Sequence, residues 1–436
     1  MVSRTVNEAL EAPPMRGATS CRHCESALSL SLVDLGKSPL CQTVLSEQAL
    51  GEAEVFYPLH AKVCTTCWLV QIPEFVAPDG IFTEYAYFSA YSDSWVDHAR
   101  RYVDMIAARL ALGPDDLVVE LASNDGYLLQ HFLPLGIPVL GIDPARNVAE
   151  AAIARGVPTL VDFFGLELAR RLADEGRRPR LILGNNVLAQ VPDVNDFVAG
   201  VKALLAEGGT ATFEFPHLMT LLEHLEYDTI YHEHFSYFSL IAIREIFGRQ
   251  GLSVVDVEEI PTHGGSLRVF FGHSEEDPVV SPAVAALAER EDASGLRDPE
   301  TYRRFESRVE MSKRVLLDLL IRARNDGKRV VGYGAPGKGN TLLNYCGIRT
   351  DLLDYTVDRN PYKQGQYTPG THIPIHPPEM IEETRPDLIL ILPWNLAAEI
   401  SAQLSYTADW GAQLVVPIPT ATVFSPGTVP DLGAAR

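Results

Sequence analysis

The sequence predicts an α/β protein in three parts: a cysteine-rich N-terminal module and two regions in which strands alternate with helices. Three observations predict this class. Four cysteines form two Cys-x2-Cys pairs near the N-terminus, and short apolar runs alternate with helical patterns twice along the chain. At 436 residues, of which 46% are hydrophobic and 21% charged, the chain is long enough for about three globular domains.

Charge and apolar patterning exclude two classes of partner. The formal net charge is −21 and no run of lysines and arginines occurs, so we expect no nucleic-acid partner. No apolar stretch reaches the roughly 20 residues that cross a bilayer, so we expect no membrane partner either. The N-terminus lacks the apolar centre of a signal peptide, which favours a cytoplasmic protein. The sequence leaves the oligomeric state open, with a monomer as the working expectation.

The cysteine pairs Cys21/Cys24 and Cys64/Cys67 predict a structural zinc site. A Cys-x2-Cys turn directs two thiolates at one ion, and two such turns complete the tetrahedral S4 set that suits zinc. Four thiolates close the coordination shell, so the ion would have no open position for chemistry. Four buried free cysteines are the plain alternative, and a redox pair is a weaker one. Cys41 lacks a partner at this spacing.

The first alternating region begins with a helix expected over residues 92–110, which Gly113-Pro114 ends. Buried strands are expected over 117–121, 137–143, 179–185 and 210–215. An apolar helix, YLLQHF, is expected directly after the first of these strands. Together these elements predict a doubly wound parallel sheet.

The second alternating region follows a segment at 275–300 that reads as a linker or surface stretch. A long helix is expected over about 301–325, because its apolar residues fall on one face. Strands are expected over 328–334, 352–358, 387–393 and 412–419. The predicted domains are therefore 1–80, 81–275 and 276–436.

The loop Glu120-Leu-Ala-Ser-Asn-Asp-Gly126 follows the first strand of the central region, where open α/β sheets bind ligands. Gly126 is its sole glycine, whereas a dinucleotide fingerprint needs three, and Asn124 suits polar contacts better than a diphosphate. The loop therefore favours S-adenosylmethionine, which has no phosphate and carries a sulfonium cation. Asp143 and Asn186 follow the next strands, and an acidic strand end can bind ribose hydroxyls. The plain alternative is that these are merely polar strand ends.

Tyr231-His232-Glu233-His234 is the densest titratable cluster in the sequence. A general base for a carbon acid near pH 7 is most often His or Glu, and a neighbouring Glu can orient an imidazole. A polar surface loop is the plain alternative. Upstream, Tyr87 belongs to a tyrosine-rich segment that reads either as a hydroxyl-bearing wall or as an aromatic core.

A second glycine-rich loop, residues 332–339, satisfies G-x-G-x-x-G after a strand and opens a helix. It can cradle the diphosphate of NAD or of a nucleotide sugar, with Gly334 and Gly337 giving access and Lys338 adding a cation. A tight turn without a ligand is the plain alternative. Arg268, in HGGSLRV, could equally belong to an ordinary hairpin.

Together these motifs resemble the sugar C-methyltransferases that act on TDP-linked 4-keto-deoxysugars and use S-adenosylmethionine. The resemblance spans roughly residues 20–395 and rests on CRHC, CTTCWLVQ, ELASNDGYLL, NNVLAQVPDVNDF, YHEHFSYFS, THGGSLRV and GYGAPGKGNTLLNY. It implies a zinc module, a class I methyltransferase core and a C-terminal Rossmann-like domain that binds the sugar nucleotide. It also implies deoxysugar biosynthesis for a secondary metabolite, such as an antibiotic.

In such enzymes a base removes the proton at sugar C-3, and the enolate takes the methyl group. The resemblance implies that His234 is this base, with Glu233, Tyr231 and Tyr87 as supporting catalytic groups. The implied cofactor residues are Glu120, Asn124, Gly126, Asp143 and Asn186. The implied substrate residues are Gly334, Gly337, Lys338 and Arg268, and the implied zinc ligands are Cys21, Cys24, Cys64 and Cys67.

The sequence departs from the family pattern at Ala122, where a glycine is usual, and at Gln190, where a histidine is common. Neither change removes a proposed catalytic group, and Ala122 bears on cofactor affinity more than on chemistry. Two alternatives compete with methyl transfer. One is an NAD-dependent oxidoreductase that acts on a nucleotide sugar through residues 332–339. The other is a non-catalytic zinc scaffold that binds nucleotide sugars or a protein.

Overall fold

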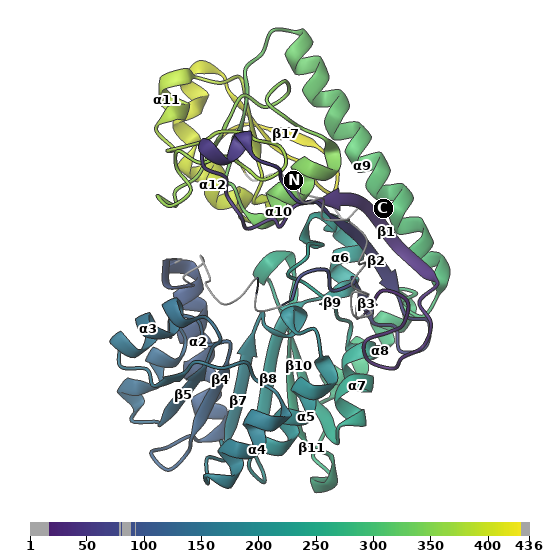
Figure 1. The fold of residues 1–436 in the computed structure, drawn as a ribbon, viewed down its shortest axis with the longest axis vertical. Helices are drawn as coiled ribbons and strands as arrows, with labels where there is room; N and C mark the ends of the chain where they lie inside the picture. Colours follow the sequence, from purple (N-terminus) through teal and green to yellow (C-terminus); the bar gives the residue numbers. More distant parts are fainter. Residues whose placement is uncertain (1–16, 78–79, 81–88, 92, 429–436) are drawn as a thin grey trace, which may run out of the picture.

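The computed structural model describes residues 17–77, 80, 89–91 and 93–428 of the chain. Three β-sheets organise these residues. Figure 1 shows the central sheet in the lower part of the view, the C-terminal region above it, and the N-terminal strands beside the long helix α9. None of the described helices is both long and apolar enough to span a bilayer.

The N-terminal sheet has the order β1-β2-β3-β9, and its neighbours pair antiparallel. Its strands are β1 (Leu30–Ser38), β2 (Tyr57–Val63), β3 (Val70–Gln71) and β9 (Ser236–Tyr237). The last strand comes from the middle of the sequence, because Val70 pairs with Tyr237. The segment 231–234 therefore leads directly into the sheet of the cysteine-rich module, which is not built from the first 80 residues alone.

The central sheet has the order β10-β11-β8-β7-β4-β5-β6. Its strands are β4 (Val118–Leu121), β5 (Val139–Ile142), β6 (Thr159–Leu160), β7 (Leu181–Asn185), β8 (Thr210–Pro216), β10 (Leu252–Ile260) and β11 (Ser266–His273). All neighbours pair parallel except β11, which runs antiparallel to both β8 and β10. This arrangement confirms the predicted doubly wound sheet.

Helices cover this sheet, since β4 and β5 are buried at every position and need apolar cover on both faces. The helices are α2 (Asp93–Leu110), α3 (Arg146–Ala154), α4 (Leu166–Asp174), α5 (Val194–Leu204), α6 (Leu218–His224) and α7 (Leu240–Arg249). Side chains from these helices and strands form the main apolar core. The carboxyl ends of the strands remain as the edge at which polar residues gather.

One expected element is wrong. YLLQHF does not form an α-helix but leads into two short 3-10 helices, η3 (Leu129–His131) and η4 (Leu133–Leu135). Pro134 has no N–H to continue an α-helix, and Gly136 turns the chain left-handed. The segment 275–300 is mostly exposed, as expected of a surface stretch, and it contains helix α8 (Pro282–Ala293), which is capped by Ser281 and buries Leu287.

The C-terminal sheet has the order β14-β13-β12-β15-β16-β17, in which all neighbours are parallel except β16 and β17. Its strands are β12 (Val330–Tyr333), β13 (Thr356–Val357), β14 (Ile375–His376), β15 (Leu388–Ile391), β16 (Gln413–Val416) and β17 (Thr422–Phe424). The helices of this region are α9 (Pro299–Asn325), α10 (Gly337–Cys346), α11 (Met380–Thr384) and α12 (Ala397–Gln403). Helix α9 contacts β1 and so ties the C-terminal region to the N-terminal sheet.

Candidate active site

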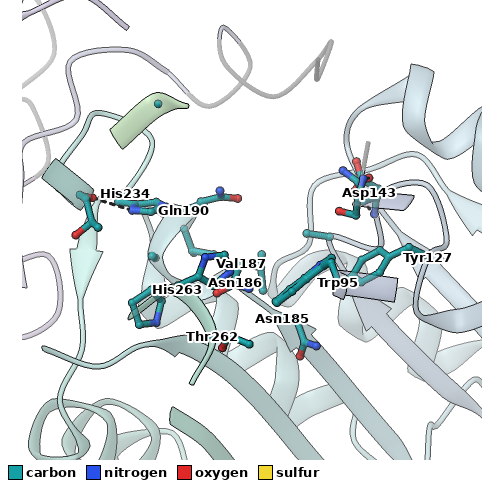
Figure 2. A pocket seen from close by; sticks show the side chains of 18 of the residues that line it. Trp95, Tyr127, Asp143, Asn185, Asn186, Val187, Gln190, His234, Thr262 and His263 are labelled. Carbon is teal, nitrogen blue, oxygen red and sulfur yellow. Dashed lines mark hydrogen bonds between the residues drawn. The ribbon is translucent and has the colours of Figure 1, made fainter. Parts of the chain in front are cut away.

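A cavity of about 1150 Å³ lies where the three regions meet. Its walls come from the carboxyl ends of the central strands, from helix α2, from residues 229–234 and from the start of α10. Ligand pockets commonly measure about 300–1,000 Å³, so this cavity is larger than most sites for a single small ligand. Figure 2 shows Asp143 and His234 on opposite sides of it, with Asn185 and Asn186 between them.

Asp143 organises the loop that follows β4. Its Oδ2 accepts a hydrogen bond from the Asn124 N–H at 2.8 Å, and its Oδ1 accepts one from the Ala145 N–H at 2.9 Å. Both Asn124 and Asp143 line the cavity, as does Ala122. Burial raises the pKa of Asp143 to about 6, because the carboxylate gives up water. Each carboxylate oxygen keeps a lone pair with which to accept a ribose hydroxyl.

Asn185 and Asn186, at the end of β7, also line the cavity. Both side-chain polar atoms of Asn185 and the Oδ1 atom of Asn186 are buried without a hydrogen-bond partner among the described residues. Asn186 adopts a left-handed φ of 56°, a conformation that asparagine tolerates better than most residues. Buried amides normally find a partner, so these groups fit a polar ligand in the cavity. S-adenosylmethionine, with its ribose and amino-acid groups, suits this donor and acceptor set.

Two predicted cofactor residues lie behind the cavity wall. Glu120 is 1% exposed, and burial raises its pKa well above the ordinary range, with Asp143 and Asp125 adding to the shift. Gly126 adopts a φ of 76°, and a Cβ there would lie 3.1 Å from Val157. These residues shape the loop from behind, and neither lines the cavity.

His234 faces the cavity from the far side. Its Nδ1 lies 3.2 Å from the Thr229 carbonyl oxygen, so an Nδ1–H donates there and leaves Nε2 as the basic nitrogen. Burial lowers the pKa of His234 to about 4, and the imidazole is neutral at pH 7. The Tyr231 ring lies 4.1 Å from the His234 ring between centroids and restrains its plane. Both residues line the cavity.

Glu233 points away from the cavity and into the junction with the N-terminal module. Its Oε1 lies 3.9 Å from the Cys41 thiol, and Gln42 also hydrogen-bonds to it. Burial raises the pKa of Glu233 to about 7, at 3% exposure. Gln42 itself lines the cavity. Glu233 is therefore placed to position the segment 231–234, not to touch a ligand.

Aromatic residues that were not among the predicted site residues line the cavity. Trp95, on α2, and Tyr127, in the apolar segment YLLQHF, both face it together with His263. The Trp95 ring lies 5.2 Å from His263 and 6.2 Å from Tyr127 between centroids. Apolar periodicity predicts only which face of a helix is shielded from solvent. Side chains that line a cavity and side chains of the hydrophobic core give the same pattern in the sequence. Gln190, at the position that departs from the family, also lines the cavity.

Arg268 lies at the floor of the cavity, where carboxylates hold its charge. It is 6% exposed and donates to Glu214 at 2.7 Å and to Glu258 at 2.7 Å. Glu214 also meets His98, at 2.9 Å. These ion pairs hold the guanidinium among carboxylates, and because Arg268 also lines the cavity, its part in substrate binding stays a prediction. The Arg268 side chain also stacks over Tyr102.

The second glycine-rich loop contributes Gly337 and Lys338 to the cavity, whereas Gly334 lies outside its lining. A Cβ at Gly334 would lie 2.7 Å from Pro393, and one at Gly337 would lie 2.9 Å from both Cys41 and Gln42. The glycines therefore allow close packing of protein segments. Tyr87, the remaining predicted catalytic residue, lies outside the described residues.

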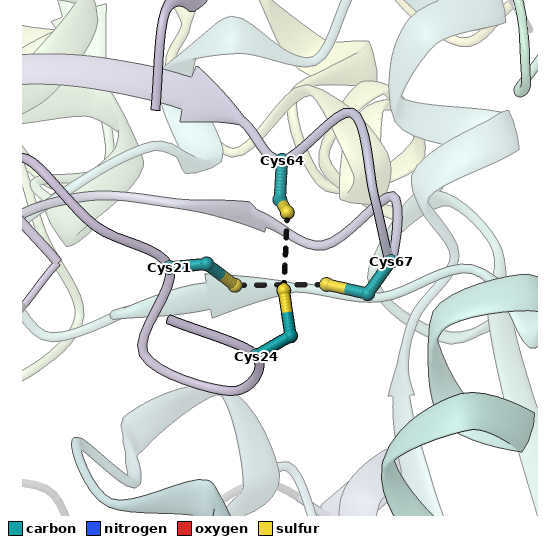
Figure 3. A group of neighbouring side chains, drawn as sticks. All are labelled: Cys21, Cys24, Cys64 and Cys67. Atoms are coloured by element: carbon teal, nitrogen blue, oxygen red, sulfur yellow. Dashed lines mark hydrogen bonds between the residues drawn. The ribbon is translucent and has the colours of Figure 1, made fainter. Parts of the chain in front are cut away.

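The four predicted zinc ligands come together in Figure 3. The Sγ atoms of Cys21, Cys24, Cys64 and Cys67 all lie within 4.8 Å of one another. Each pair sits on the same kind of turn: the Glu25 N–H donates to the Cys21 carbonyl, and the Trp68 N–H donates to the Cys64 carbonyl. Four converging thiol groups fit one tetrahedral Zn²⁺. Cys41 lies apart, against Glu233.

Family models match three consecutive parts of the chain. A zinc binding domain matches residues 21–82, a methyltransferase domain matches 95–257, and a C-methyltransferase C-terminal domain matches 261–419. With the strand order of the central sheet, these matches define a class I methyltransferase that uses S-adenosylmethionine and carries a zinc-binding module.

The chain is 38% identical over 411 residues to the C-methyltransferase NovU of Streptomyces niveus, an alignment that covers 94% of this chain and 98% of NovU. The chain belongs to this family of C-methyltransferases. Over 93 residues it is also 28% identical to the ubiquinone biosynthesis O-methyltransferase of Bartonella quintana, covering 21% of this chain and 38% of that protein. Family membership favours methyl transfer over the oxidoreductase and scaffold alternatives.

Among solved structures, the magnesium protoporphyrin IX methyltransferase of Synechocystis PCC 6803 matches 41% of this chain and 81% of its own, with 17% identity and a TM-score of 0.31. A methyltransferase of Archaeoglobus fulgidus matches 40% of this chain and 93% of its own, with 10% identity and a TM-score of 0.34.

Proposed function

We propose that this enzyme transfers a methyl group from S-adenosylmethionine to C-3 of a TDP-linked 4-keto-deoxyhexose, with His234 as the base. The deoxysugar would serve a secondary metabolite. One observation carries the proposal: a neutral imidazole with Nε2 available faces the polar strand ends across one large cavity. The division into domains 1–80, 81–275 and 276–436 stays part of this proposal, as does a supporting role for Tyr87.

The reaction requires the protein to supply a base and to place the sugar and the methyl donor in the correct orientation. The ketone at C-4 acidifies the neighbouring C–H bonds, and His234 Nε2 takes the proton at C-3. The C–H electron pair then forms the C-3=C-4 double bond, and the carbonyl pair moves onto the oxygen. When bound, S-adenosylmethionine supplies an electrophilic methyl group and leaves as S-adenosylhomocysteine. Holding the two ligands in line can supply about 7–11 kcal/mol of the barrier reduction.

Neighbouring residues keep His234 in the protonation state that this role needs. The Thr229 carbonyl selects the tautomer, and Tyr231 restrains the ring. Glu233 acts indirectly, because its contacts with Cys41 and Gln42 anchor residues 231–234 to the N-terminal module. Asp143, Asn124, Asn185 and Asn186 would hold the methyl donor on the opposite side.

The test is His234→Asn, with His232→Asn as the matched control. His232 Nε2 lies 3.1 Å from the Pro58 carbonyl, and this side chain does not line the cavity. Loss of a general base costs roughly 10²–10⁴-fold in rate. We expect methyl transfer to a TDP-4-keto-6-deoxyhexose to fall by that factor in His234→Asn, with S-adenosylhomocysteine affinity unchanged by calorimetry. The control should stay within about threefold.

The position of methylation needs a separate readout, because a ketone at C-4 acidifies both C-3 and C-5. Solvent deuterium should enter the sugar at C-3 in the absence of methyl donor, and His234→Asn should abolish that exchange. Exchange at C-5 alone would contradict the C-3 assignment. Near-normal turnover in His234→Asn would overturn the role of this histidine.

A further inference from the structure

Lys338 brings an ammonium group into the cavity from the C-terminal region, as the second residue of α10. Its Nζ donates to Asn395 Oδ1 at 2.7 Å and lies 4.6 Å from the centroid of the Trp394 ring. Trp394 is held in turn, since its Nε1–H donates to Asp228 Oδ2 at 2.8 Å. The lysine is therefore fixed by a hydrogen bond and an aromatic face.

Buried acidic groups lie behind this ammonium. Asp228 is 0% exposed and Glu226 is 1% exposed, and Asp228 keeps one carboxylate oxygen without a partner among the described residues. Burial lowers the pKa of Lys338, while Asp228 and Glu226 act in the opposite direction. The acidic groups thus help keep a desolvated lysine charged, and a desolvated cation interacts strongly with a nearby negative charge.

The ammonium shares the cavity with the proposed base. Lys338 and His234 both line it, and the positive charge of Lys338 contributes to the lowered pKa values of His234 and His263. In a sugar whose C-3 proton contacts His234, the ketone oxygen is bonded to the neighbouring ring atom C-4, two bonds from C-3. Lys338 enters the same cavity from the C-terminal region, so one bound sugar can contact both groups.

The surrounding loop is less suited to a diphosphate than its G-x-G-x-x-G pattern indicates. Diphosphates bind such loops by close approach to backbone N–H groups. Here Cys41 and Gln42 pack against Gly337, Pro393 packs against Gly334, and the Ala335 N–H donates to Asp358 at 2.8 Å. Of the residues by which this loop lines the cavity, Pro336, Gly337 and Lys338, the lysine alone carries a charged side chain.

We propose that Lys338 is a catalytic residue that donates a hydrogen bond to the C-4 oxygen and stabilises its negative charge in the enolate. This inference rests on the proposed function. As His234 takes the C-3 proton, the C–H pair becomes the C-3=C-4 bond and the carbonyl pair moves to oxygen, beside the ammonium. Lys338 keeps its protons throughout, so charge returns to neutral when the ketone is restored.

The test measures enolate formation without the methyl donor. Solvent-deuterium exchange into C-3 of a saturating TDP-4-keto-6-deoxyhexose is followed by NMR for the unaltered enzyme and for Lys338→Met, and TDP affinity is measured by calorimetry. Removing one oxyanion donor typically costs about 10²–10³-fold in rate. We expect exchange in Lys338→Met to fall by that factor, with TDP affinity within about threefold, and Lys338→Arg to retain part of the rate.

The matched control is Lys363→Met, a second lysine at the same loop whose Nζ donates to the Ala335 carbonyl at 2.8 Å and does not line the cavity. It should leave exchange unchanged. S-adenosylhomocysteine binding shows whether each variant is folded. Unchanged exchange in Lys338→Met at saturation, with weakened TDP binding, would make Lys338 a diphosphate anchor and overturn the inference alone. Absence of exchange in the unaltered enzyme would overturn the proposed function as well.

Discussion

The two glycine-containing loops of this enzyme are held by the same kind of hydrogen bonding, and they differ in what surrounds them. In the central sheet, the carboxylate of Asp143 accepts hydrogen bonds from the Asn124 and Ala145 N–H groups. In the C-terminal sheet, the carboxylate of Asp358 accepts them from the Ala335 and Asn360 N–H groups, both at 2.8 Å. In each sheet an aspartate after one strand holds the loop of the neighbouring strand.

What surrounds the two loops differs. Asp143 lines the large cavity, and buried carboxylates rather than a cation are its charged neighbours. Asp358 does not line it, and Lys363 Nζ lies 4.0 Å from its Oδ2. The loop with the better dinucleotide fingerprint thus packs against other protein segments at Gly334 and Gly337, and it reaches the cavity through Gly337 and Lys338. A glycine pattern indicates that another group lies close to the backbone. That group can be a ligand or another segment of the same chain.

The largest expected effect separates the two aspartates by ligand affinity. Asp143→Asn should weaken S-adenosylhomocysteine binding by about 10–100-fold, because a charge-assisted hydrogen bond contributes about 1.5–3 kcal/mol. Asp358→Asn makes the same chemical change to the same kind of loop and should alter affinity by less than about threefold. Calorimetric titration of both variants checks this. Equal losses would mean that the aspartates act only by holding their loops.

A second comparison concerns stability instead of affinity and tests whether packing explains the glycines of the second loop. Gly334 has a φ of 85° and its Cβ position lies 2.7 Å from Pro393, so Gly334→Ala should lower the free energy of unfolding by about 2–3 kcal/mol. Gly347, with a φ of 71° and no atom within 4 Å of its Cβ position, is the matched control. Gly347→Ala should cost only about 1 kcal/mol, the conformational part. Urea unfolding measures both, and equal losses would argue against the packing explanation.

The smallest effect concerns Glu233, which joins the segment 231–234 to the second loop through Cys41. Its pKa is raised to about 7, above the value in an unfolded chain, so folding favours the protonated form. That stability is present below the unfolded pKa and is lost as pH rises towards 7. Glu233→Gln should therefore be more stable than the unaltered enzyme by about 1–2 kcal/mol at pH 8, and by little at pH 5.

Unfolding curves at pH 5, 6, 7 and 8 measure this difference. Because Glu233 is almost fully buried, solvent screening should not mask it. A gap between the two proteins that stays constant across these pH values would show that the Glu233 carboxyl does not titrate in this range.

Local patterns predicted most of the architecture. The strand runs, the long helix and the two cysteine pairs each depend on a few neighbouring residues, and the structure confirms them. Local patterns failed at YLLQHF, where Pro134 and the left-handed Gly136 break the helix. This failure arises because a single proline outweighs apolar periodicity.

The sequence by itself determined the α/β class, the four converging cysteines and the polar strand ends at Asn124, Asp143 and Asn186. Tertiary structure alone decided what packs against the second glycine-rich loop, because the Cβ position of Gly337 lies 2.9 Å from Cys41 and Gln42, almost 300 positions away in the chain. It likewise decided that Glu233 faces the zinc module while His234 faces the cavity. Such outcomes depend on long-range packing, and no local pattern of residues encodes which distant segment fills a given space.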